Sequence, residues 1–163
     1  MVHENIMDQF RRSDFVSADT LRIDDFSQIG TYLVQGEIGC QGNIVVTVHQ
    51  ILDVVAGGDI PEVHVSRYSY NVRVLGQHNV FRYDNCHPHE GHQDSHHKDV
   101  FNFITGDRVD TIWVGEGKWP TLGEVIEEAR TWGSQNRDLL DNPNAFPTVE
   151  DLEADVRSPF GPI

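Results

Sequence analysis

Four stretches of the chain carry the hydrophobic pattern of β-strands. Residues 31–38 and 44–52 are rich in β-branched residues and are separated by the turn sequence Gly-Cys-Gln-Gly-Asn. Residues 63–74 and 79–84 alternate between apolar and polar positions and are separated by a short turn around Gly76. Because short turns join consecutive strands into hairpins, the pattern predicts an antiparallel sheet.

The period of two also assigns the side chains of the last two strands to faces of the sheet. In 63–74 the even positions, from His64 to Val74, include both tyrosines and predict one buried face. In 79–84, Phe81 and Tyr83 would join that face. The hairpin then predicts a second, outward face that holds four charged side chains: Arg67, Arg73, Arg82 and Asp84.

Helical patterns flank the predicted sheet. Thr121 followed by Glu124 forms a capping-box sequence before an apolar stripe, which predicts a helix that ends near Gly133. A similar start within 146–156 predicts a second, short helix. Apolar residues spaced by four predict a short N-terminal helix over 3–13.

Together these elements predict one α+β domain. A twisted antiparallel sheet of four to six strands would pack against a C-terminal helix, with short helices at both ends of the chain. Segments 100–104 and 108–114 are the candidates for the further strands. The domain would span 1–133, and 134–163 would be an extension that holds the short helix and a flexible tail.

Charge narrows the function classes. The 12 basic residues stand against 26 acidic ones, a formal net charge of −14, which argues against nucleic-acid binding through bulk charge. Ten of the basic residues are arginine and sixteen of the acidic ones are aspartate, and this bias predicts a halophilic source in which mobile cations screen the surface. Two cysteines and the lack of a long apolar run predict a cytoplasmic protein with neither a disulfide framework nor a membrane span.

One segment departs from this acidity. Residues 63–100 hold four arginines and lysines against four acids, so their formal charge is zero, and they hold seven of the nine histidines. Histidine protonation would make this segment positive. We therefore expect a polyanion to dock here.

The residue types in this segment suit metal-independent cleavage of RNA. The reaction needs a base near the 2′-hydroxyl, an acid near the leaving 5′-oxygen and cations around the phosphorus. Asp84 could orient a histidine, and Arg82 could stabilise the developing charge. The candidate acids and bases are His87, His89, His96 and His97, and the candidate phosphate-binding residues are Arg67, Arg73 and Lys98.

Two other interpretations stay open at this point. The histidines could hold a divalent metal ion such as zinc, nickel or manganese, although their spacing matches no strict signature. They could also form a solvated loop without chemistry. The metal-binding alternative would use five residues: His87, His89, His92, His96 and His97.

The segment 63–130 resembles the TumE-like family of small toxins from prokaryotic toxin–antitoxin systems. The likeness rests on five motifs: Arg67-Tyr-Ser-Tyr70, Arg82-Tyr-Asp-Asn85, His87-Pro-His89, His96-His-Lys98 and Pro120-Thr-Leu122. It implies a toxin with ribonuclease activity and a separately encoded antitoxin as partner. Asp99 stands where the family often has another histidine. The main alternative is a non-enzymatic accessory protein that binds a metal or a partner, and a homodimer is a further open question.

Overall fold

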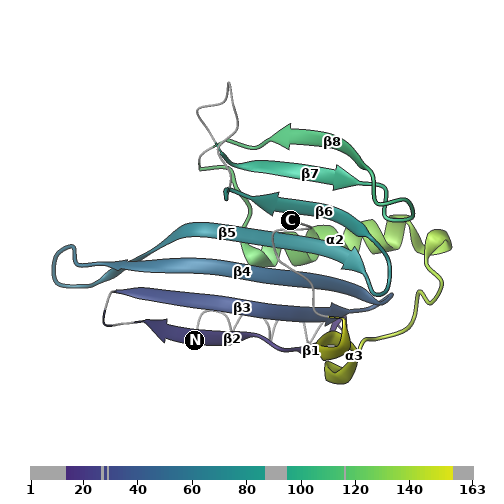
Figure 1. Ribbon diagram of the computed structural model, residues 1–163, viewed down its shortest axis with the longest axis horizontal. Coiled ribbons are helices and arrows are strands. Elements are labelled where there is room, and N and C mark those ends of the chain that lie inside the picture. The colour runs from purple at the N-terminus through teal and green to yellow at the C-terminus, as the bar shows by residue number, and fades with distance from the viewer. Residues whose placement is uncertain (1–13, 27, 29, 87–94, 116, 156–163) are drawn as a thin grey trace.

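The computed structural model describes residues 14–26, 28, 30–86, 95–115 and 117–155, and its centre is one antiparallel sheet of eight strands (Figure 1). The strand order is β1-β3-β4-β5-β6-β7-β8, and β2 also pairs with β3. The strands are β1 (Val16–Asp19), β2 (Arg22–Phe26), β3 (Thr31–Cys40), β4 (Ile44–Val55), β5 (Glu62–Val74), β6 (Asn79–Asp84), β7 (His97–Phe101) and β8 (Arg108–Trp113). Two helices follow, α2 (Leu122–Gln135) and α3 (Val149–Ala154), with a 3-10 turn (Arg137–Leu139) between them. The helix predicted over 3–13 lies outside the described residues.

One face of the sheet and α2 enclose the apolar core. The even positions of β4, and those of β5 from Tyr68 onward, fall on this face, so that Val46, Tyr70 and Val72 are fully buried. From α2, Val125 and Ile126 pack onto the same cluster. We call this side of the sheet the helix face. The alternation therefore predicted the core correctly for the central strands.

Both helices begin at the predicted capping boxes. The Thr121 hydroxyl accepts a hydrogen bond from the Glu124 amide, and the Glu124 carboxylate accepts one from the Thr121 amide. Thr148 and Asp151 make the same reciprocal pair at the start of α3. Because these pairs satisfy amides that the first helical turn leaves free, local sequence fixes both starting points.

The α+β class is confirmed, but the sheet has eight strands where four to six were predicted. The two additional strands at the start, β1 and β2, pair with successive halves of β3. Both are short edge strands, and β2 contains Asp24 and Asp25 and exposes most of its residues. β1 alternates over only four residues, and β2 does not alternate and buries none of its side chains, because an edge strand needs to bury little.

A bulge in β5 overturns one predicted position. Ile51 pairs with Arg67 and Leu52 pairs with Val65, so Ser66 is an extra residue in its strand. Residues on either side of a bulge exchange faces relative to a regular strand. As a result Val65 packs against the core, and His64 does not share the face of Tyr68 as predicted.

The helix α2 continues past Gly133, where the prediction ended it. A Cβ atom at Gly133 would lie 2.7 Å from Cδ1 of Ile44, so the glycine permits close contact with the sheet and does not stop the helix. The helix ends at Asn136, whose side chain donates to the Trp132 carbonyl over 2.9 Å. Beyond it, Leu140 and Leu152 are buried, so this part of the chain also packs on the sheet.

Candidate functional site

The face of the sheet opposite α2 carries a continuous polar surface, which we call the polar face. Strand register aligns two transverse rows on it: Glu37, Thr47, Asn71, Arg82, Asp99 and Thr111, and beside them Gln35, His49, Ser69, Asp84, His97 and Trp113. Arg82 and Asp84 share this face as predicted. The face was predicted to point outward, but it is largely buried: Asn71 is 3% exposed, Asp84 2% and Asp99 1%. Buried polar side chains need partners, and they find them in one another.

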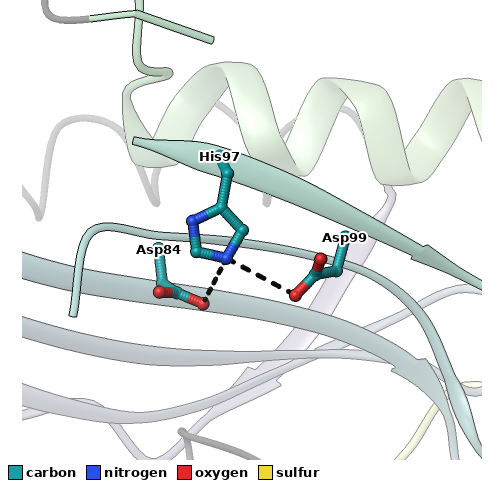
Figure 2. Close-up of side chains that lie close together, drawn as sticks. All are labelled: Asp84, His97 and Asp99. Carbon is teal, nitrogen blue, oxygen red and sulfur yellow. Dashed lines mark ion pairs between the residues drawn. The ribbon is translucent and has the colours of Figure 1, made fainter. Parts of the chain in front are cut away.

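Four charged side chains of β6 and β7 form a compact cluster within these rows, which we call the Arg82 cluster. The Arg82 guanidinium lies 3.0 Å from Asp84 Oδ2 through Nε and 3.0 Å from Asp99 Oδ2 through its terminal nitrogen. Figure 2 shows His97 pointing between the two carboxylates, with Nε2 at 3.6 Å from Asp84 and 3.5 Å from Asp99. Each of the two acids therefore faces both an arginine and a histidine.

The surroundings of His97 favour its protonated form. Nδ1 donates to the Ser95 carbonyl over 2.8 Å, and Nε2 faces only carboxylate oxygens among the contacts of this cluster. Burial alone would lower the pKa of His97, but the hydrogen bond with Asp99, the Ser95 carbonyl and the two negative charges outweigh burial and raise the pKa above its usual value of 6.5. These contacts favour the protonated ring, whose Nε2 proton is directed at the aspartates.

Asp99 is the most heavily coordinated acid in the cluster. Its Oδ1 accepts a hydrogen bond from the Thr111 hydroxyl at 2.8 Å and lies 3.7 Å from Arg108. Burial would raise the pKa of Asp99, but the His97 ring, Thr111 and Arg82 together hold it well below the usual range. Arg108 is 58% exposed, so the cluster reaches the surface on the β8 side.

The same residues offer ligand atoms for a metal ion, but the set does not fit one. Asp84, His97 and Asp99 each present a ligand atom, and these atoms lie within 4.8 Å of one another. However, Arg82 already contacts one oxygen of each aspartate at 3.0 Å. A guanidinium between the carboxylates supplies the positive charge that an ion would bring and would repel it. The donor set is therefore that of an internally neutralised ion-pair cluster.

Arg73, a predicted phosphate-binding residue, belongs to a different cluster on the polar face. Its guanidinium contacts Glu37 at 2.8 Å and Asp155 at 3.1 Å, and its side chain is fully buried. Burial raises the pKa of Glu37, and Arg73 partly offsets this rise. We call this group the Arg73 cluster and leave Arg73 out of the candidate site.

The structure divides the predicted histidine and lysine residues between the two faces of the sheet. His96 stacks on Tyr68 and Trp119 and hydrogen-bonds the Tyr68 hydroxyl at 2.9 Å on the helix face. Lys98 also lies on this face, where it pairs with Glu128 of α2. His96 and His97 cannot ligate one metal ion in this arrangement, because they lie on opposite sides of β7.

Of the remaining predicted residues, Arg67 lies within β5 and the others lie outside the described residues. Arg67 is exposed and donates to the Cys86 carbonyl over 3.3 Å. His87, His89 and His92 lie outside the described residues. Arg67 therefore marks the point where the chain leaves β6 toward the histidine-rich segment.

Sequence reasoning missed Asp99, a member of the Arg82 cluster, and Arg108, which contacts Asp99 from β8. The signal for Asp99 was available, since extending the period of two through 97–101 places it beside His97. No comparable signal pointed to Arg108, whose place follows from the register shift in the pairing of β7 with β8.

Comparison with known proteins gives no match for this chain: no family model, no curated protein and no solved structure is similar to it. The resemblance to TumE-like toxins thus rests on the quoted motifs alone. None of the helices in the described residues has the length and apolarity needed to cross a membrane.

Proposed function

We propose that this protein is the toxin of a toxin–antitoxin pair and cleaves RNA without a metal ion. The observation that carries the proposal is the Arg82 cluster, in which an imidazole ring and a guanidinium are fixed side by side on the polar face. The motif that forms it, Arg82-Tyr-Asp-Asn with His96-His-Lys98, is also the motif that carries the family resemblance.

In this proposal His97 acts as the general acid. The 2′-oxygen of RNA attacks the phosphorus, the bond from phosphorus to the 5′-oxygen breaks, and a cyclic phosphate forms. His97 gives its Nε2 proton to the leaving 5′-oxygen, and a base takes the 2′-hydroxyl proton. His87 or His89 is the predicted base. A histidine whose pKa is raised by neighbouring carboxylates holds its proton more readily, which suits the acid role.

Cationic side chains around the cluster support the same reaction. Arg82 presents a planar fork of donors, which suits phosphate oxygens and the charge that develops on them. Arg108 and Arg67 are exposed and could position neighbouring phosphates. These local cations act against a strongly acidic surface, so we expect the RNA affinity to be modest.

Burial of the cluster favours a second candidate, a non-enzymatic protein that binds a partner. The side chains of Asp84, His97 and Asp99 are only 2–3% exposed, and their charges are mutually compensated. A cluster of this kind could hold β6 and β7 in shape for binding rather than react.

A cleavage assay with matched histidine variants tests the proposal. We expect purified protein to cleave cellular RNA in the presence of a chelator and to slow growth when expressed alone. His97→Gln should lower cleavage by at least about 100-fold. His64→Gln should leave it unchanged, because His64 is exposed and pairs only with Glu62 in the described structure.

A variant of an exposed arginine tests the cleavage mechanism without disturbing the fold. Arg108→Met should lower the rate about tenfold without unfolding the protein, since its side chain is 58% exposed. Loss of activity with chelator would overturn the metal-free mechanism. A folded wild-type protein that neither cleaves RNA nor slows growth would favour the binding protein.

A further inference from the structure

A cavity of about 460 Å³ lies between α2 and the strands β6 to β8, on the helix face and thus on the other side of the sheet from the Arg82 cluster. The chain has only two lysines, Lys98 and Lys118, and both line this cavity. All ten other basic residues are arginines. The cavity therefore concentrates a residue type that the chain uses nowhere else.

Hydrogen bonds in the cavity wall occupy its two acidic residues. Glu128 accepts a hydrogen bond from the Tyr83 hydroxyl at 2.7 Å and pairs with Lys98. Glu124 accepts hydrogen bonds from the Thr121 amide at 2.7 Å and the Thr121 hydroxyl at 3.2 Å. Both carboxylates are therefore held in place by partners within the chain.

The two lysines differ in how far they are engaged. The Lys98 ammonium lies 4.7 Å from the centre of the Phe81 ring and 5.3 Å from that of Tyr83, and its side chain is 18% exposed. Lys118 is exposed and makes no ion pair within the part of the chain that the structure describes. One lysine is thus held in place at the base of the cavity, and the other remains available to an incoming anion.

The rest of the wall is apolar, with Ile112, Val114 and Pro120 among its members. Lysine ammonium groups bind phosphate as point charges, and a flat ring buries well against aliphatic side chains. We propose that this cavity binds a mononucleotide, with the phosphate between Lys98 and Lys118 and the base against the apolar wall. The inference does not rest on the proposed ribonuclease activity, because it concerns binding on the opposite face of the sheet.

Calorimetric titration of the full chain with adenosine monophosphate, adenosine and inorganic phosphate tests the site. We expect saturable binding of the monophosphate and none of adenosine. Lys98→Met keeps the aliphatic stem on the rings and should weaken binding about tenfold, or about 1.4 kcal/mol. Lys118→Met should weaken it about threefold. Arg130→Met is the matched control, since Arg130 is half exposed on α2 and does not line this cavity.

A variant that is expected to strengthen binding provides a second test. Glu128→Gln removes a negative charge beside Lys98 and keeps a hydrogen-bond acceptor for Tyr83, so it should bind the monophosphate more tightly than the wild type. The proposal is overturned if the folded wild type shows no saturable binding, or if Lys118→Met binds as the wild type does. Equal affinity for inorganic phosphate and the monophosphate would overturn the assignment to a nucleotide.

Discussion

The two arginine clusters of the polar face contain similar charged groups but connect different parts of the fold. The Arg73 cluster joins β5 to β3 and to the end of α3, residues that lie 36 and 82 positions apart in the chain. The Arg82 cluster lies on the neighbouring strands β6 and β7 and contacts β8 through Asp99, and backbone ladders already hold these strands together. An ion pair that connects separate elements has a structural task, whereas the Arg82 cluster adds little to strand pairing.

The two clusters also differ in how far their arginine side chains are exposed. The Arg73 side chain is 0% exposed and that of Arg82 is 13% exposed. Arg108 extends the second cluster to the surface, while the first is closed by α3. A guanidinium on a polar strand face is therefore a candidate for function only where the fold does not depend on it.

Removal of Arg73 should produce the largest loss of stability. Arg73→Met leaves the Glu37 carboxylate buried without its main partner, so we expect the free energy of unfolding to fall by about 3–5 kcal/mol in urea denaturation. Glu37→Leu added to Arg73→Met should recover most of this loss, because the acid that remains, Asp155, is 27% exposed and reaches water. A loss below about 1 kcal/mol for the single variant would contradict the structural role.

The loss of stability caused by Arg73→Met should also depend on pH. The pKa of Glu37 is already raised by burial, and removal of Arg73 would raise it further. We therefore expect the stability difference between wild type and Arg73→Met to shrink as the pH falls and Glu37 takes up a proton.

A smaller, opposite pH dependence should identify the Arg82 cluster. The pKa of His97 is raised in the folded protein, so its charge contributes fully below the usual value of 6.5, and the contribution is lost as the pH rises through the folded value. His97→Gln should cost about 1–2 kcal/mol at pH 6 and less at pH 9. Thermal melts of both proteins across this range would measure it, and a difference independent of pH would contradict the imidazolium assignment.

Salt should have the smallest effect on the stability loss caused by Arg73→Met. The halophilic expectation predicts a higher melting temperature in molar salt than in dilute buffer, because the net charge of −14 is then screened. Fully buried pairs are screened much less, so the loss caused by Arg73→Met should change by no more than about 0.5 kcal/mol. A wild-type melting temperature that is equal in both buffers would remove the halophilic interpretation.

Local patterns predicted the elements that bury a clear apolar face or carry a cap. The period of two was sufficient for β3 to β6, and reciprocal side-chain pairs at Thr121 and Thr148 were sufficient for the starts of α2 and α3. The edge strands β1 and β2 could not be predicted in this way, since their formation depends on pairing with β3, which is a contact between distant parts of the chain.

The candidate site was predictable only in part for a related reason. Alternation placed Arg82 and Asp84 on one face, but it does not say whether that face is covered. The candidate strand was placed at 100–104, whereas β7 begins at His97, so the strand character of His97 and its pairing with Asp84 were missed. Arg73 has the same local pattern as Arg82, and only its distant partners Glu37 and Asp155 separate the two.

The sequence His96-His97-Lys98-Asp99 sends neighbouring side chains to opposite sides of one strand, so β7 separates the Arg82 cluster from the lysine-lined cavity. A slip of β7 by one residue against β6 would turn each of these groups toward the opposite side, and the cluster and the cavity would lose their β7 residues together. A slip by two residues would restore the facing. The register of β7 therefore cannot change for one of the two sites without changing for the other.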